Sequence, residues 1–135
     1  MTGLDTNVLV RYLAQDDARQ SAMATRWIEE ELSPSQPGFV SLVVLVEVCW
    51  VLQRLYAATQ DELLQTVEDL LGAAQFLVEQ RAVVQAAALR MRSLKGVKVG
   101  FADLLIVELG KSHGCEHIMS FDKVAVRSAG MTLLR

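Results

Sequence analysis

Four acidic residues stand where the surrounding sequence gives little reason for a charge. Asp5 ends a short apolar run at the N-terminus, and Asp122 directly follows another apolar run. Glu47 is the only charged residue between Leu42 and Leu52, and Asp103 has apolar neighbours on both sides. An ionised carboxylate in apolar surroundings costs several kcal/mol unless it is paired or binds a cation. These positions therefore predict either a metal site or specific local partners.

Mutual repulsion decides what the four carboxylates can do if the fold brings them together. At about 5 Å and an effective dielectric near 20, each of six like-charge pairs costs roughly 3 kcal/mol. The total, about 20 kcal/mol, exceeds the usual stability of a domain, about 5–15 kcal/mol. Such a cluster requires raised pKa values or bound cations, and all-oxygen sites favour Mg²⁺ or Mn²⁺. Because one or two such ions activate water and stabilise a leaving oxygen, the chemistry indicated is phosphodiester hydrolysis.

Each of these acids also has a structural alternative. Asp5 could cap the helix that follows it, and Asp122 could be a turn residue or a cap. Glu47 and Asp103 could reach solvent or form salt bridges, although no basic residue lies three or four positions away on the same helical face. The sequence alone leaves these alternatives open.

Short strands alternating with helices must position the acids. The pattern predicts one α/β domain over residues 1–135, with a mainly parallel sheet whose ligands bind at the carboxyl ends of the strands. Predicted strands cover residues 1–4, 39–40, 76–78, 117–121 and 131–134. Predicted helices cover residues 8–13, the stretch from an Asp16 or Asp17 cap to about 32, 41–55, the stretch from the Thr59 capping box to 71, 81–94, and 101–109 or on to 114.

The stretch from Ser41 to Leu55 is ambiguous between strand and helix. Its many valines favour a strand, whereas Ser41 is a good N-cap and the run is long for a strand. We predict a helix. Asp16 or Asp17 caps the preceding helix, and the run from Thr59 to Glu62 fits a capping box for the next one.

Composition bounds the class of protein. The chain has 135 residues, 52% of them hydrophobic, and a net charge of −3 from 13 basic and 16 acidic residues. This charge balance is not the basic excess typical of a nucleic-acid-binding protein. If four of the acids bind metal, however, the net charge of the other residues is slightly positive. The apolar surplus suggests a second subunit or another partner. Two cysteines in unlike contexts, no signal peptide and no long apolar run predict a cytoplasmic protein without a membrane segment.

Four motifs in order along the chain carry a resemblance to a known family. They are Leu4-Asp5-Thr6-Asn7-Val8-Leu9 with Arg11-Tyr12-Leu13, then Val40-Ser41 leading to Val46-Glu47-Val48, then Phe101-Ala102-Asp103 with Leu104-Leu105, and Ser120-Phe121-Asp122-Lys123. With these motifs the chain resembles the PIN-domain ribonucleases, and most closely the VapC-type toxins of bacterial and archaeal toxin–antitoxin pairs.

The resemblance implies a three-layer α/β/α fold with a twisted, mainly parallel central sheet. It implies a Mg²⁺- or Mn²⁺-dependent endoribonuclease that forms homodimers and is inhibited by a small cognate antitoxin. The family's acidic positions fall on Asp5, Glu47, Asp103 and Asp122, which the resemblance makes both catalytic residues and metal ligands. Thr6 and Asn7 fall where relatives support the first acid, and Ser41 falls where a small hydroxyl residue often lies near the site.

Two positions depart from the family pattern. Many relatives carry a D-F-A-D sequence, whose first acid corresponds to Gly100, and Gly3 replaces a bulky apolar residue. The missing acid leaves open whether one or two ions bind, and it supports an alternative function, a non-catalytic PIN-like module that binds RNA or protein.

Basic and aromatic residues supply candidate nucleic-acid contacts. We expect the aromatic residues Trp27, Trp50 and Tyr56 to pack in the core rather than to stack on bases. Candidate phosphate contacts, with an exposed solvated surface as the alternative, are Arg11, Arg54, Lys95, Lys98, Lys111, Lys123 and Arg127.

Overall fold

A computed structural model describes all 135 residues as helices joined by very short strands. The elements, in chain order, are β1 (Thr2–Gly3), α1 (Thr6–Ala14), α2 (Ala18–Glu31), β2 (Gly38–Val40), α3 (Leu42–Tyr56), α4 (Gln60–Gly72), β3 (Phe76–Val78), α5 (Arg81–Ser93), α6 (Phe101–Ser112), β4 (Met119–Ser120), the π-helical turn η1 (Ala125–Ala129) and β5 (Thr132–Leu133). Every predicted helix and strand is present, and only η1 was not predicted.

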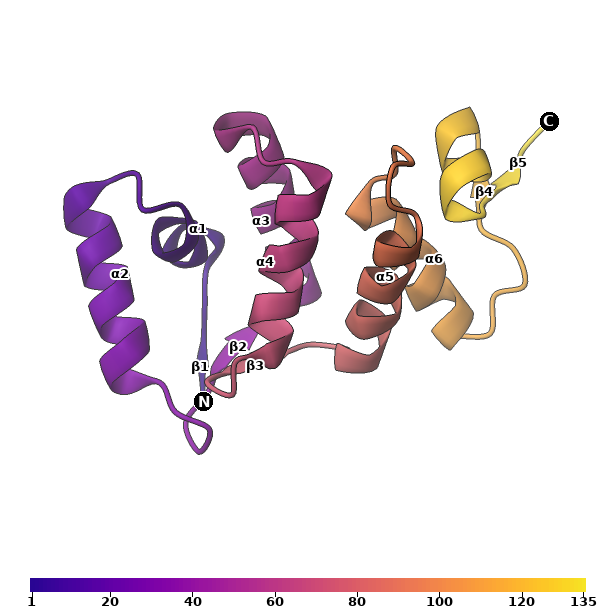
Figure 1. Cartoon of the computed structure of the whole chain (residues 1–135). Coiled ribbons are helices and arrows are strands. Elements are labelled where there is room, and N and C mark those ends of the chain that lie inside the picture. Colours follow the sequence, from indigo (N-terminus) through magenta and orange to yellow (C-terminus); the bar gives the residue numbers. More distant parts are fainter.

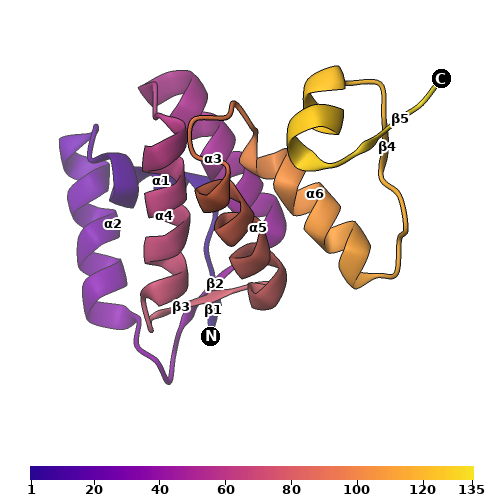
Figure 2. The same cartoon turned by 45° about the vertical axis from the view of Figure 1, so that its right-hand side comes forward.

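The strands pair in parallel, as predicted, but they form two sheets. One sheet has the order β1-β2-β3, and the other contains only β4 and β5. The three-stranded sheet lies below α1, α3 and α4 in Figure 1, whereas β4 and β5 lie beyond α6 at the other end of the molecule. Figure 2 shows the same separation from a second direction. Helices and parallel strands together are consistent with the three-layer α/β/α class.

Capping residues set where the helices begin. The Asp17 carboxylate accepts the Gln20 N–H at the start of α2, and the Ser41 hydroxyl accepts the Val44 N–H at the start of α3. Before α4, the Thr59 hydroxyl accepts the Glu62 N–H, and the Glu62 carboxylate accepts the Thr59 N–H. These two hydrogen bonds form the predicted capping box. Each cap satisfies N–H groups that have no partner within the helix.

The ambiguous valine-rich stretch is the helix α3. Its buried side carries Leu45, Val48, Cys49 and Leu52, while Val43 on its outer side is 74% exposed. The serine cap and a run of 15 residues outweigh the strand propensity of the valines. Tertiary burial of one helical face supplies the stabilisation that propensity does not.

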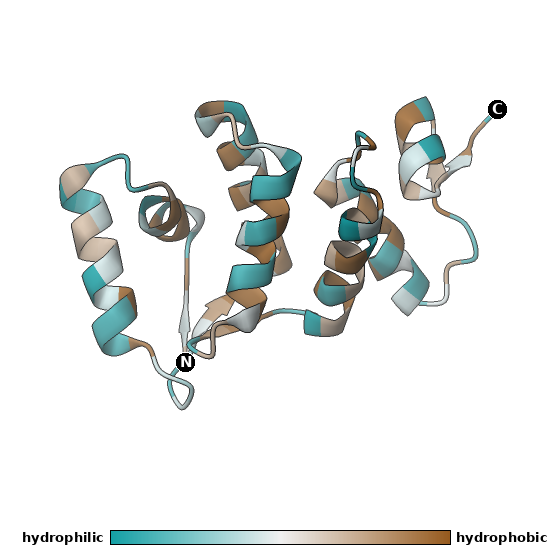
Figure 3. Ribbon diagram, viewed as in Figure 1, coloured by the Kyte–Doolittle hydropathy of each residue, from teal (hydrophilic) through white to brown (hydrophobic).

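Amphipathic helices enclose one continuous hydrophobic core of 30 buried residues. On α4, hydrophilic residues form a stripe toward the viewer and hydrophobic residues lie along its edges (Figure 3). Leu63 on α4, Val84 on α5 and Leu104 on α6 are completely buried, so all three helices contribute to this core. No helix is sufficiently long and apolar to cross a lipid bilayer.

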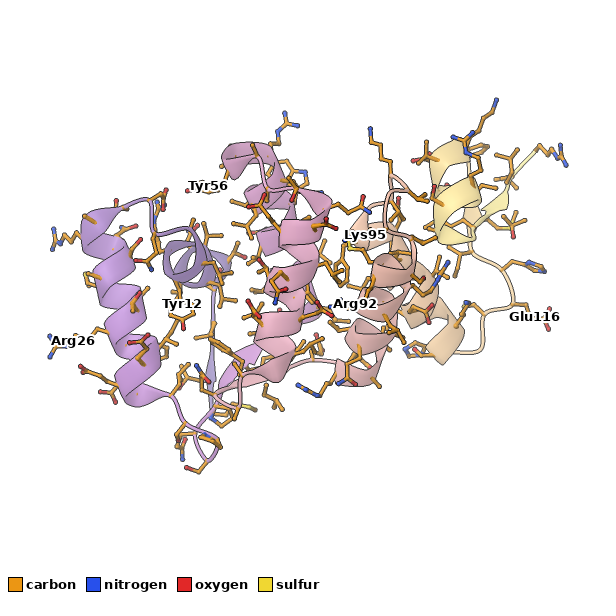
Figure 4. The ribbon with its side chains drawn as sticks, viewed as in Figure 1. Tyr12, Arg26, Tyr56, Arg92, Lys95 and Glu116 are labelled. Atoms are coloured by element: carbon orange, nitrogen blue, oxygen red, sulfur yellow. The ribbon has the colours of Figure 1, made fainter.

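A polar cluster of Arg11, Asp16 and Tyr56 joins α1 and the α1–α2 turn to the end of α3. The Arg11 guanidinium donates to both carboxylate oxygens of Asp16 at 2.9 and 3.0 Å, and the Tyr56 hydroxyl donates to Asp16. Tyr56 reaches toward α1 and α2 in Figure 4. The Tyr56 hydroxyl, followed by the Arg11 hydrogen bond, lowers the pKa of Asp16.

Candidate functional site

Asp5 lies between the end of β1 and the first turn of α1, with its carboxylate free. It occupies the N-cap position with an extended backbone, and its carbonyl accepts the N–H groups of Val8 and Leu9. Its side chain makes no capping hydrogen bond and has no salt-bridge partner within the protein. The capping alternative is therefore realised by the backbone alone, which leaves the exposed carboxylate available to a ligand.

The carboxyl edge of the three-stranded sheet places Asp5, Ser41 and Glu79 in a row. Gly3 pairs with Phe39 and Val40 pairs with Val78. Continuing this register puts Asp5 beside Ser41 and Ser41 beside Glu79, with neighbouring strands about 4.8 Å apart. In parallel sheets, this edge is where ligands bind.

Glu79 is an acidic residue that the sequence reasoning missed. Its carboxylate accepts the Leu42 N–H at 2.8 Å, so it caps α3 across the sheet together with Ser41. The available signal was its position, because Glu79 directly follows an apolar strand as Asp5 does. By fixing the start of α3, Glu79 also fixes the helix that carries Glu47.

Glu47 projects from α3 at an apolar groove between α3 and α6. The groove has a volume of about 550 Å³, and Glu47 is the only charged residue that lines it. The other lining residues are apolar: Leu42, Val43, Val46, Trp50, Ala102, Leu105, Ile106 and Leu109. The Glu47 side chain is exposed and has no hydrogen bond or salt bridge, so the solvent-exposed alternative describes its present surroundings.

Asp103 and Asp122 come close enough to influence each other. Partial burial, and then the charge of Asp122, raise the pKa of Asp103 above its ordinary value. Asp122 itself accepts the N–H groups of Val124 at 2.8 Å and Ala125 at 3.3 Å, so its capping alternative is realised. Asp122 can cap this turn and still bind a cation, because both capping hydrogen bonds use Oδ1 and Oδ2 has no protein partner. Two near carboxylates whose charges repel form an oxygen donor pair that suits a hard divalent cation.

The four predicted acids do not form one cluster within the chain. Asp5 belongs to the edge of the three-stranded sheet, Glu47 to the groove, and the Asp103–Asp122 pair to the C-terminal half. No three acidic, histidine or cysteine side chains lie together as a metal-binding group. Within one chain the structure therefore brings together one pair of the four, and convergence of all four stays a prediction.

Comparison with known proteins decides the family. A family model described as the PIN domain matches residues 4–130. The chain belongs to the PIN domain family. Members are generally nucleases and generally use divalent metal ions. No curated protein and no solved structure matches the chain significantly.

The PIN-domain match includes Gly100 and the two polar residues after the first acid. Thr6 is buried in the first turn of α1, whereas Asn7 is exposed and lines a groove beside β1. Gly100 is the N-cap of α6 and has no side chain to cap it. A Cβ built on Gly100 would lie 3.5 Å from an Asp103 carboxylate oxygen, an ordinary contact. The backbone of this PIN domain would thus accommodate the acid that many relatives have there.

Several basic residues of the PIN domain remain without acidic partners. Arg11 forms an ion pair with Asp16, and the Lys111 amino group lies 3.7 Å from Glu108. Either residue would have to give up its ion pair to bind phosphate. Basic side chains without a salt bridge or hydrogen bond include Lys95, Lys98, Lys123, Arg54 and Arg127. Of these, Lys98 precedes α6 and Lys123 follows Asp122, which places them next to the acidic pair in the sequence.

The expectation that all three aromatic residues pack in the core is wrong for the tryptophans. Trp50 is 56% exposed and Trp27 is 37% exposed. The Arg54 guanidinium lies 5.4 Å from the centre of the Trp50 ring, a cation–π contact on the surface. Because Trp50 lies on the outer side of α3, burial of the inner side does not include it. An exposed aromatic ring beside an arginine can stack on a base.

Proposed function

We propose that this PIN domain is a divalent-metal-dependent endoribonuclease and the toxin of a toxin–antitoxin pair. The observation that carries the proposal is the family match over residues 4–130, which spans all four acids, from Asp5 to Asp122. The Asp103–Asp122 pair adds support, since partial burial and then the charge of Asp122 raise the pKa of Asp103, and a cation would compensate that charge.

In this proposal Asp5, Glu47, Asp103 and Asp122 hold one or two Mg²⁺ or Mn²⁺ ions. When bound, such ions lower the pKa of water and stabilise negative charge on a phosphodiester. The free carboxylates of Asp5 and Glu47 have no protein partner to give up, so binding a cation costs them no hydrogen bond. Lys98 and Lys123 attract the phosphate backbone of RNA toward the acidic pair.

Cleavage of RNA by carboxamide variants tests the proposal. We expect Asp5→Asn and Asp103→Asn each to reduce cleavage in millimolar Mg²⁺ by at least about 100-fold, because an amide is a poor ligand for a hard cation. Circular dichroism should be unchanged. Glu116→Gln is the matched control, since Glu116 projects outward from the loop before β4 (Figure 4), is exposed and has no hydrogen bond or ion pair. Full cleavage by either aspartate variant contradicts the proposal.

A substrate panel defines the reaction further. The proposal expects cleavage of structured RNA, and not of DNA or of phosphomonoesters. Cleavage products should appear from internal positions, as an endonuclease produces. Equal cleavage of DNA would make the protein a general nuclease.

The alternative function, a non-catalytic module that binds RNA or protein, rests on Gly100. A site that lacks one acid holds fewer ligands for a second ion. If millimolar Mg²⁺ or Mn²⁺ neither raises the Tm nor permits cleavage, the binding module is favoured. Gly100→Asp then tests whether the missing acid causes the inactivity, because a Cβ at position 100 makes only ordinary contacts with Asp103. Cleavage restored by Gly100→Asp would identify the missing ligand as the cause of inactivity.

We also propose a small cognate antitoxin as partner. The groove between α3 and α6 presents an apolar surface with Glu47 inside it, a combination that fits an apolar segment carrying a basic residue. Co-expression with the product of a short neighbouring gene should yield a stable complex in which RNA cleavage is inhibited. RNA cleavage that no neighbouring gene product inhibits would contradict this assignment.

A further inference from the structure

The side-chain amide of Gln60 holds the loop between α5 and α6. Gln60 is the first residue of α4, and its Nε2 donates to the Val97 carbonyl at 2.9 Å, while its Oε1 accepts the Val99 N–H at 3.1 Å. This loop stands beside the beginning of α4 in Figure 2. No other side chain hydrogen-bonds to residues 95–100. Gln60 thus links the loop to a helix that is distant in the sequence.

The two hydrogen bonds have the pattern of a parallel β-bridge around Lys98. The amide bonds the carbonyl of the residue before Lys98 and the N–H of the residue after it, as a neighbouring parallel strand does. A chain held in this way directs successive side chains to opposite sides. Val99 is buried, at 4% exposed, whereas Lys98 is exposed. The Gln60 amide therefore holds Lys98 with its side chain outward.

The beginning of α6 has no side-chain cap of its own. Gly100 occupies the N-cap position and has no side chain to accept an N–H. Val99 and Phe101 anchor this part of the chain in the core, but apolar burial is non-directional. The hydrogen bonds of Gln60 supply the direction that burial does not.

Lys98 lies close to the acidic pair. The Asp103 carboxylate turns back toward the start of α6, since one of its oxygens lies 3.5 Å from a Cβ built on Gly100. Lys98 is two residues before Gly100, and two residues span at most about 7 Å. The Lys98 ammonium forms no ion pair or hydrogen bond within the chain, so it is available to a phosphate.

We propose that Gln60 is a positioning residue for RNA binding: its amide fixes the direction of Lys98, and Lys98 binds a phosphate of the RNA strand beside the Asp103–Asp122 pair. This inference rests on the proposed function and adds to it how the substrate is held. Gln60 acts through Lys98, because both ends of its amide are engaged by the loop.

Hydrogen exchange tests the clamp without any measurement of activity. Gln60→Met keeps the length of the side chain and removes both hydrogen bonds. We expect the Val99 N–H to exchange at least about tenfold faster in this variant, because its acceptor is gone. Gln65→Met is the matched control, since Gln65 lies on the same helix and its amide donates only to Asp69, one turn later. Unchanged exchange at Val99 in Gln60→Met overturns the proposal.

RNA binding tests the positioning role. An Asp5→Asn background, which should not cleave, allows the Kd for a single-stranded RNA to be measured with Mg²⁺ at several salt concentrations. Lys98→Met should reduce the slope of log Kd against log salt by about 0.7, the loss of one phosphate contact. Gln60→Met should reduce it by a similar amount, and the double variant should bind no more weakly than Lys98→Met alone. Additive losses, or an unchanged slope in Gln60→Met, contradict the proposal.

Kinetics separates positioning from general destabilisation. In the otherwise wild-type chain, Gln60→Met should raise KM several-fold with little change in kcat, because a phosphate contact away from the reacting bond binds substrate and transition state alike. A fall in kcat with unchanged KM would make the positioning role wrong. A wild type that neither binds nor cleaves RNA refutes the proposed function together with the role of Lys98, and the exchange at Val99 then decides the clamp by itself.

Discussion

Several charged side chains on α4 and α5 have partners, whereas the carboxylates of Asp5 and Glu47 at the candidate site have none. Glu62 belongs to the capping box of Thr59, and Glu68 pairs with Arg92 on α5. Asp5 and Glu47 have neither hydrogen bonds nor ion pairs for their carboxylates, although Glu47 stands in an apolar groove. Helix capping and ion pairing account for the charges of Glu62, Glu68 and Arg92. The carboxylates of Asp5 and Glu47 have no such role within the folded chain, so both are available to a ligand.

The largest expected effect on stability comes from a core residue of α4. Leu63→Ala removes a completely buried side chain and should lower the free energy of unfolding by about 2–5 kcal/mol. Urea unfolding followed by circular dichroism measures the loss. RNA cleavage at temperatures below the lowered Tm should be unchanged. A loss of cleavage without unfolding would show that the two regions are coupled.

A smaller effect is expected from the capping box. Thr59→Ala removes the hydroxyl that accepts the Glu62 N–H and should cost about 1 kcal/mol. Hydrogen bonds from Thr59 lower the pKa of Glu62 below its usual 4.5. The contribution of Glu62 is therefore present above pH 4.5 and is lost as the pH falls through the lowered pKa. The difference in Tm between the wild type and Glu62→Gln, measured from pH 3 to 7, should shrink in acid. A difference that does not change with pH would contradict this prediction.

At the candidate site, a substitution should instead stabilise the metal-free protein. Because burial and Asp122 raise the pKa of Asp103, the folded chain holds that proton more tightly than the unfolded chain does. Wild-type stability should fall as the pH rises from 3.8 through the raised pKa. Asp103→Asn should thus have a slightly higher Tm than wild type at pH 7 in EDTA, with the gain vanishing in acid.

Asp61→Asn is the matched control for this measurement, since Asp61 is exposed on α4 and makes no hydrogen bond or ion pair. Added Mg²⁺ should raise the Tm of wild type and not that of Asp103→Asn. If the Tm gain of Asp103→Asn does not depend on pH, the gain does not come from loss of the Asp103 charge, and the prediction is wrong.

The smallest effect on stability is expected at Glu47. Glu47→Gln removes a charge that has no partner, so the free energy of unfolding should change by less than about 0.5 kcal/mol. RNA cleavage should nevertheless fall by at least about 100-fold. A large loss of stability would reveal a structural role for Glu47 and remove the contrast between the two regions.

Local chemistry made the helices predictable, but it could not specify the pairing of the strands. Ser41 and Thr59 mark helix starts through hydrogen bonds to residues three positions away, which any short window of sequence contains. Pairing of β4 with β5, rather than with β1, depends on how α6 packs on α5, and no local signal encodes that packing. Strands of two or three residues also carry little register information.

The candidate site divides in the same way. The unusual surroundings of four acids in the sequence predicted a site; the structure places Asp103 near Asp122, and the joint role of all four stays a prediction. It missed Glu79, whose use as a cap for α3 depends on the alignment of β3 with β2. It also misjudged Trp50, because an apolar run does not reveal which helical face meets the core.

The cluster of Arg11, Asp16 and Tyr56 has a consequence for local unfolding. It fastens the C-terminal part of α1 to the end of α3, so α1 cannot open without breaking the contacts of both helices. Amide protons of α1 and of the last turn of α3 should exchange with solvent as one cooperative unit. Tyr56→Phe should divide that unit into two, with faster exchange in α1 and little change in α4.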